Sequence, residues 1–274
     1  YLQEIYTRNG DEQVLHKIAS IYYLFLKDQQ KAISLYRAHI KKYGITPLIG
    51  ENLALIYLQM KAYRQAGQIY EELYQETLNE LYAKNALDIY FQANQANMDL
   101  AQRFLEKNPL IDLRDQMLLE IYSQKKDYKR AIETLQRLYE QTNDVGFLGF
   151  KAIMSYESTK NPSDEKLIQS VIKDLKEVVK EIDDALYWNY LGYLMIDHDI
   201  NISEGMEYVK KALLKDPSNA YYLDSLAWGY YKLGDCKNAQ LTIQEIPLEM
   251  VEKEKEIRGH FDVITQCVFK EGRL

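Results

Sequence analysis

The stretch that decides the fold runs from residue 185 to residue 246 and reads ALYWNYLGYLMIDHDINISEGMEYVKKALLKDPSN (185–219) followed by AYYLDSLAWGYYKLGDCKNAQLTIQEI (220–246). Its two halves are consecutive copies of one helical hairpin. Each half has an aromatic-rich first helix, a polar turn, and a second helix with a small residue near its start, Gly205 or Ala239. A repeat of this length indicates a structure built from stacked hairpins.

The same pattern predicts further hairpins upstream. Only a small side chain fits where two helices cross closely, so each second helix should carry a small residue followed four positions later by a bulky one. Six second helices meet this condition, and the intervals between their small residues are 34, 35, 30, 74 and 34. The interval of 74 leaves room for one degenerate hairpin near residues 146–184. The small residues are Ala32, Ala66, Ala101, Ala131, Gly205 and Ala239.

One motif connects these hairpins to a known family. Its residues are Trp188, Leu191, Gly192, Gly205, Ala212 and Pro217. In this spacing they resemble a tetratricopeptide repeat, a helix-turn-helix unit of about 34 residues. The resemblance implies an all-α fold, a right-handed α-α superhelix of about seven hairpins. We expect one solenoid over residues 1–274, with hairpins at about 13–46, 47–80, 81–111, 112–145, 146–184, 185–219 and 220–247.

The repeat pattern stops at Pro247, and one amphipathic helix is predicted at about 249–270. Its apolar stripe is spaced by four, three and four residues, and the other face is strongly charged. A solenoid exposes apolar surface at its open end, so we interpret this helix as a C-terminal cap. The stripe consists of Ile257, Phe261, Ile264 and Val268.

Composition and motifs argue against several functions. The net charge of -7 disfavours nucleic acid as the main partner, because duplex binding usually needs a clustered basic face. No run of about 18 apolar residues is available to span a membrane. The four histidines fall on different hairpins or the cap, and no zinc-protease, phosphate-loop or nucleophile-elbow motif occurs. We therefore predict no enzyme activity, no cofactor and no metal site.

The resemblance implies a noncatalytic scaffold that binds a partner peptide, helix or surface. In this family the first helices line the inner concave surface, where aromatic residues can act as rigid anchors. An apolar or aromatic groove with acidic rims suits a partner whose apolar anchors are flanked by Lys or Arg. The candidate groove residues are Leu55, Glu120, Tyr193, Tyr221, Asp224, Trp228 and Tyr231.

Two alternatives stay open. The chain could be a regulatory or recruitment module of a larger protein whose catalytic or anchoring part lies upstream, or it could be a homo-oligomeric assembly unit. It begins at Tyr1 rather than at Met, which we interpret as the removal of a signal peptide, a lipid-anchored linker or further repeats.

The only two cysteines, Cys236 and Cys267, are candidates for a disulfide. Cys236 begins a second helix, and Cys267 lies near the end of the cap, which should run beside that position. The bridge would require Cα atoms about 4.4–6.8 Å apart and would imply an oxidising compartment. It therefore favours the bacterial periplasm or cell envelope over the alternative, the cytoplasm.

Overall fold

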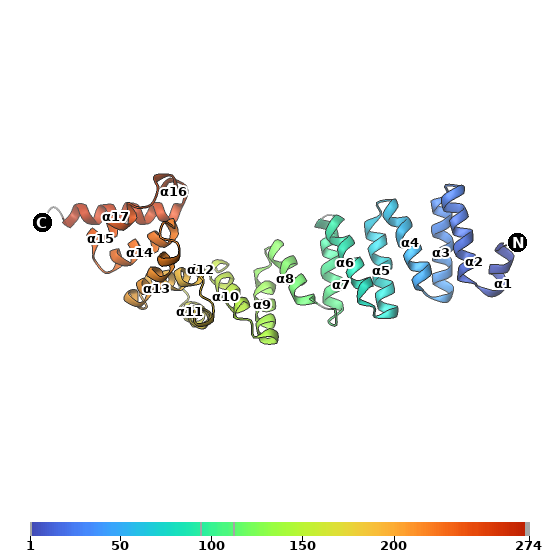
Figure 1. The fold of residues 1–274 in the computed structure, drawn as a ribbon, viewed down its shortest axis with the longest axis horizontal. Coiled ribbons are helices and arrows are strands. Elements are labelled where there is room, and N and C mark those ends of the chain that lie inside the picture. The colour runs from blue at the N-terminus through green and yellow to red at the C-terminus, as the bar shows by residue number, and fades with distance from the viewer. Residues whose placement is uncertain (1, 94, 112, 272–274) are drawn as a thin grey trace. The chain divides into compact units, whose positions relative to one another are not determined.

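The computed structural model describes residues 2–93, 95–111 and 113–271, and the side chains of these residues except 93, 95–96 and 268–271. Among the described residues the regular structure is helical, with no β-strand (Figure 1). The predicted all-α class is therefore confirmed. The chain forms two compact units, Tyr1–Ile121 and Tyr122–Leu274, which we call unit 1 and unit 2. The sequence pattern predicts one solenoid over residues 1–274 and contains no signal for this division.

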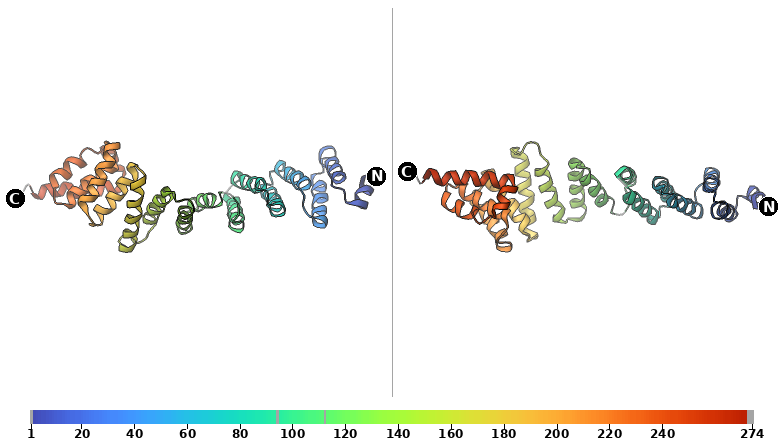
Figure 2. Two further views of the ribbon diagram at one scale, coloured as in Figure 1. Left: turned by 60° about the horizontal axis from the view of Figure 1, so that its bottom comes forward. Right: turned by 90° about the horizontal axis from the view of Figure 1, so that it is seen from above.

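Unit 1 is a succession of antiparallel helices (Figure 2). The short helix α1 precedes three hairpins, which correspond to those predicted at 13–46, 47–80 and 81–111. The first helix of the first hairpin ends in a π-helical turn, η1. The elements are α1 (Leu2–Asn9), α2 (Glu12–Ser20), η1 (Ile21–Phe25), α3 (Gln29–Tyr43), α4 (Pro47–Gln59), α5 (Tyr63–Thr77), α6 (Glu80–Ala93) and α7 (Gln95–Lys107).

The division between the units falls within α8, and unit 2 continues with the remaining helices. The degenerate hairpin predicted near 146–184 is α10 with α11, whose 17 residues make it longer than the other second helices. The elements are α8 (Arg114–Gln124), α9 (Tyr128–Thr142), α10 (Val145–Glu157), α11 (Glu165–Glu181), α12 (Ala185–Asp197), α13 (Ile202–Lys215), α14 (Ala220–Lys232), α15 (Cys236–Ile243), α16 (Leu248–Lys253) and α17 (Lys255–Glu271).

Local sequence explains where most of these helices begin. An Asp or Asn stands at the N-cap, and its side chain accepts a hydrogen bond from a backbone N–H of the first turn, which would otherwise have no partner. This arrangement defines the helix boundaries independently of the hydrophobic repeat. The capping residues are Asp11, Asp28, Asp127, Asp144, Asp164, Asp184, Asn201, Asn219 and Asp235.

The predicted small residues lie at buried positions of the second helices. Ala32, Ala66, Ala101, Ala131 and Ala239 are completely inaccessible to solvent, and Gly205 is buried. The backbones of α12 and α13 also approach closely, because a Cβ atom added to Gly192 would lie 2.5 Å from the carbonyl oxygen of Gly205. Because no larger side chain fits there, these positions determine how tightly the two helices of a hairpin pack.

The predicted cap at 249–270 is not one helix, and this corrects the sequence prediction. The short helix α16 ends at Lys253, Glu254 adopts an extended conformation, and α17 begins at Lys255. The charged run 252–256 contains no apolar residue that could bury a continuous helix there, whereas Val251 before it and Ile257 after it are both buried. Ile257 and Ile264 enter the core as predicted, while the side chain of Val268 lies outside the described residues.

No helix in the described part of the chain has both the length and the apolar character that crossing a bilayer requires.

Candidate functional site

Several first helices share a register that places equivalent side chains on the solvent side of each unit. In α4 and α14 a fully buried alanine is followed directly by a residue on the solvent side, in the pairs Ala54–Leu55 and Ala227–Trp228. Tyr193 follows the buried Gly192 in the same way. We call the solvent side of the first helices the first-helix face, and we describe it separately for unit 1 and unit 2.

In unit 1 the first-helix face is open and apolar. The side chain of Leu55 is 49% exposed, and Leu24, in the π-helical turn, is 53% exposed. Ile21 and Leu81 are also exposed. The exposed Glu51 accepts a 2.8 Å hydrogen bond from the Tyr82 hydroxyl, so an acidic group lies one turn from Leu55 on α4.

In unit 2 the same face is aromatic and is partly covered by α17. The indole N–H of Trp228 donates to Asp197 Oδ1 at 3.0 Å. One stacked neighbour of the indole is Tyr231, with ring centroids 4.9 Å apart, and the other is His260 of α17, at 4.1 Å. Both views in Figure 2 show α17, the long red helix, lying along α14 and α15. Trp228 and Tyr231, two of the candidate groove residues, are therefore half-buried.

A second contact joins α17 to α12. The Tyr193 hydroxyl donates to the Glu256 carboxylate. Burial, followed by this hydrogen bond and the charge of Asp197, raises the pKa of Tyr193. Tyr193 is thus protonated at neutral pH and acts as a hydrogen-bond donor.

Polar aromatic residues extend this face onto α10. The Tyr190 hydroxyl donates to Glu157 Oε1 at 2.6 Å, and the Tyr156 hydroxyl lies 2.8 Å from His198 Nε2. Burial and the charges of Asp197, Glu157 and Glu256 raise the pKa of Tyr156 to about 12. Several carboxylates therefore lie around the rings, which makes this face acidic as well as aromatic.

The other predicted groove residues have different surroundings. Tyr221 is 49% exposed at the start of α14, and Glu120 is exposed on α8. The prediction that Asp224 lies in an open groove is wrong. Asp224 is only 5% exposed, because α17 packs over it and His260 Nδ1 lies 2.9 Å from its Oδ2. The sequence could not reveal this contact, since the two residues are 36 positions apart and belong to different helices.

The two cysteines lie side by side in unit 2. Cys236, the first residue of α15, is paired with Cys267 of α17, and their Cα atoms are 5.7 Å apart. This separation falls within the range that a disulfide needs. The pair ties the C-terminal half of α17 to the second helix of the last hairpin.

The four histidines make packing contacts and do not come together. His16 Nδ1 lies 2.9 Å from the Tyr36 hydroxyl, and His39 Nδ1 lies 2.9 Å from the Tyr6 hydroxyl. His198 and His260 bond to Tyr156 and Asp224 as described above. Within the described ranges, no three His, Cys, Asp or Glu side chains are grouped as metal ligands would be.

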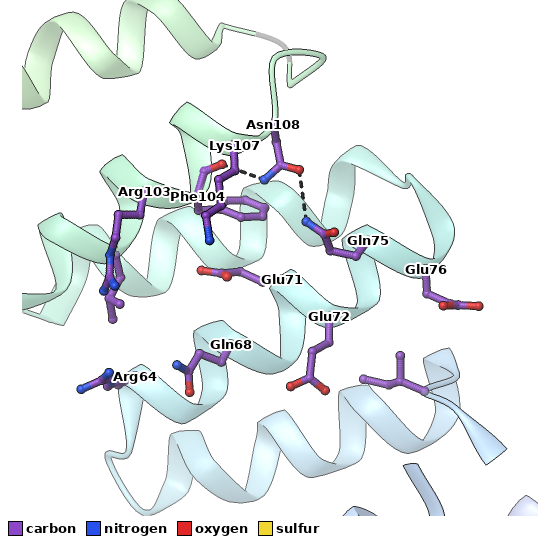
Figure 3. A pocket seen from close by; sticks show the side chains of 12 residues that line it. Arg64, Gln68, Glu71, Glu72, Gln75, Glu76, Arg103, Phe104, Lys107 and Asn108 are labelled. Carbon is purple, nitrogen blue, oxygen red and sulfur yellow. Dashed lines mark hydrogen bonds between the residues drawn. The ribbon is translucent and has the colours of Figure 1, made fainter. Parts of the chain in front are cut away.

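Sequence reasoning missed a cleft of about 740 Å³ between the second helices α5 and α7 of unit 1 (Figure 3). Its wall carries both charges, with Arg103 and Lys107 on α7 facing Glu71 on α5. Burial raises the pKa of Glu71, although the Tyr90 hydroxyl donates to this carboxylate at 2.6 Å and the two cations oppose the shift. These charges compensate one another within the cleft. The repeat pattern gives no signal for it, because that pattern concerns only the buried faces of the second helices.

Comparison with known proteins finds one relative with a similar sequence. No protein-family model matches the chain. The TPR repeat-containing protein PA4667 of Pseudomonas aeruginosa is 26% identical over 180 residues, which cover 58% of this chain and 30% of that protein. The chain thus matches less than a third of the length of this relative.

Solved structures are also similar. The structure of the APC/C hetero-tetramer Cut9-Hcn1 has a TM-score of 0.47 at 14% identity, covering 96% of this chain and 51% of that chain. A tetratricopeptide repeat protein from Parabacteroides merdae has a TM-score of 0.36 at 14% identity, covering 83% and 89%. With its successive hairpins and its small residues at buried second-helix positions, the chain has a tetratricopeptide-like, all-α helical-repeat fold.

Proposed function

We propose that this protein is a noncatalytic scaffold that binds a protein partner on its first-helix faces. The observation that carries the proposal is the apolar surface of unit 1, where Leu24 and Leu55 are about half exposed. Exposed apolar side chains that gather on one face beside polar residues are typical of interaction sites.

The chemistry of the face defines the kind of partner. Leu55 and Leu81 offer apolar contacts on adjacent first helices, while Glu51 and Asp88 on the same helices are exposed carboxylates. A partner with apolar anchors flanked by Lys or Arg is complementary to this arrangement. The net charge of -7 for the whole chain also favours a positively charged partner.

We further propose that the protein acts in the bacterial cell envelope. The support is the pairing of Cys236 with Cys267, since structural disulfides persist in oxidising compartments and are rare in the cytosol.

A photo-crosslinking amino acid placed at Leu55 tests the binding proposal. It should capture a partner, whereas the same group at Gln65, on the exposed side of α5 in the same hairpin, should not. With the captured partner purified, Leu55→Glu should weaken binding by about tenfold or more, and Gln65→Glu should leave it unchanged. Capture at Gln65 alone, or unchanged binding by Leu55→Glu, would place the partner elsewhere and refute the proposal.

A further inference from the structure

The first turns of α17 cross the first-helix face of unit 2 and contact it at two separate points. Glu256 accepts from the Tyr193 hydroxyl of α12. One turn later, His260 stacks on Trp228 of α14 with an interplanar angle of 16°. The same imidazole bonds to Asp224 through Nδ1. α17 is therefore attached to the aromatic surface by groups that carry, or can carry, a charge.

The contact between His260 and Asp224 is enclosed. The two residues are 9% and 5% exposed, and Asp224 Oδ1 has no hydrogen-bond partner among the described residues. A carboxylate can only accept, so His260 Nδ1 carries a proton in either charge state of the ring. The charge on the ring nevertheless matters. A buried carboxylate without a counter-charge is strongly destabilising, and imidazolium supplies that counter-charge.

Groups on every helix packed around His260 favour the charged ring. Asp224 bonds to the ring from α14, the charge of Asp197 acts from α12, and Glu256 lies one turn before it on α17. Lys232, the nearby cation on α14, is held 2.7 Å from Asp199 Oδ2 and 3.0 Å from the Asp197 carbonyl oxygen.

Burial alone would lower the pKa of His260. The hydrogen bond and charge of Asp224, together with Glu256 and Asp197, outweigh burial and raise it. A raised pKa in the folded state means that the stabilisation is complete below the unfolded value, near 6.5, and is lost as the pH rises through the folded value.

We propose that His260 is a proton-controlled contact that determines how firmly α17 is held over the Tyr193–Trp228 surface. When the ring is charged, α17 is fixed. When it is neutral, Asp224 becomes a buried charge without a counter-ion, and the first turns of α17 loosen about the helix break at Glu254. Ile264 is buried in the core and the disulfide holds the other end of α17, so the change is confined to the first turns.

The consequence for binding rests on the proposed function. Loosening α17 uncovers Trp228 and Tyr193, so the aromatic face should be more accessible above neutral pH than below it. The contact itself can be tested without any partner.

Hydrogen–deuterium exchange of residues 255–264 in the full chain, with the disulfide intact, provides the test. After correction for intrinsic exchange rates, protection should fall about fivefold between roughly pH 6 and pH 8.5, which is the difference expected between a charged and a neutral hydrogen bond. His260→Gln should give low protection at both pH values. Asp224→Asn removes the buried charge and should make protection independent of pH.

His198→Gln is the matched control, because His198 pairs with Tyr156 at the end of α12 and does not contact α17 through any bond described above. The His198→Gln variant should show the same pH-dependent protection of residues 255–264 as the wild-type protein. A proton NMR titration of the His260 ring in the unmodified chain covers the case in which a variant fails to fold. Flat protection in the unmodified protein, or an unaltered pH dependence in His260→Gln, would overturn the proposal. Neither result would affect the crosslinking test at Leu55.

Discussion

Leu55 in unit 1 and Trp228 in unit 2 occupy the same place in their hairpins, yet they have different surroundings. Each directly follows a fully buried alanine on a first helix. Leu55 is half exposed. Trp228 lies between Tyr231 and His260 and donates its N–H to Asp197. Repeat register therefore determines which side chains lie on the first-helix face, whereas a helix outside the repeats determines whether they remain accessible.

The largest effect is expected from the disulfide, which exists only in unit 2. Replacing both Cys236 and Cys267 by Ser should lower the free energy of unfolding of unit 2 by about 3–4 kcal/mol, because the bridge closes a loop whose ends are 31 residues apart. Unit 1 should be unaffected. Urea denaturation followed by residue-resolved hydrogen exchange measures both. Two alkylated cysteines in protein isolated under a thiol-blocking reagent would contradict the pairing and the envelope proposal.

A bulky side chain at a close helix crossing should show whether unit 1 and unit 2 lose stability independently. Ala66→Leu in unit 1 and Gly192→Leu in unit 2 should each cost about 1–3 kcal/mol, because both sites lack room for a larger side chain. We expect the loss of exchange protection to be confined to the unit that carries the substitution. If Ala66→Leu melts at the wild-type temperature, the register assigned to the second hairpin is wrong.

Truncating the two equivalent residues compares the two faces directly. Trp228→Ala should destabilise unit 2 by about 2 kcal/mol, since it removes a half-buried ring and leaves Asp197 without its indole donor. Leu55→Ala should change stability by no more than about 0.5 kcal/mol, because the side chain is half exposed and lies outside the core. Thermal unfolding measures the loss of stability in each variant. Equal losses would contradict the proposed difference between the covered face of unit 2 and the open face of unit 1.

The smallest effect concerns the propensity of α17 itself. Gly259→Ala should stabilise unit 2 by about 0.5–1 kcal/mol, because alanine favours the helix and nothing lies within 4 Å of the added methyl group. Calorimetry measures the change in melting temperature. Gly192→Ala is the matched control, because there the same methyl group meets the backbone of Gly205. A destabilised Gly259→Ala protein would mean that this side of α17 is covered.

Several features of the fold could be predicted from the sequence. Buried small residues such as Ala66 and Ala131 appeared at the expected intervals because close helix crossings leave no alternative residue type. Cys236 and Cys267 could be placed near each other because hairpin stacking fixes where the helix after the last repeat must run. These predictions depend on local periodicity and on one general packing rule.

Other features could not be predicted. The π-helical turn at 21–25 and the break at Glu254 depend on the balance between helix continuation and burial, which an amphipathic pattern does not resolve. The cleft between α5 and α7 depends on how far apart two second helices lie. The role of Asp224 changed from groove residue to buried partner of His260 because α17 packs against it.

By itself, the sequence determined the helical hairpins, their register and the identity of the residues on the first-helix faces, because these follow from periodicity, capping and the size of side chains at helix crossings. Only the tertiary structure decided which of those residues remain open. Leu55 is accessible, whereas Trp228 is partly covered because α17 packs on α14 through side-chain contacts such as His260 with Asp224, which are 36 positions apart. Contacts at such separations leave no local pattern in a single sequence.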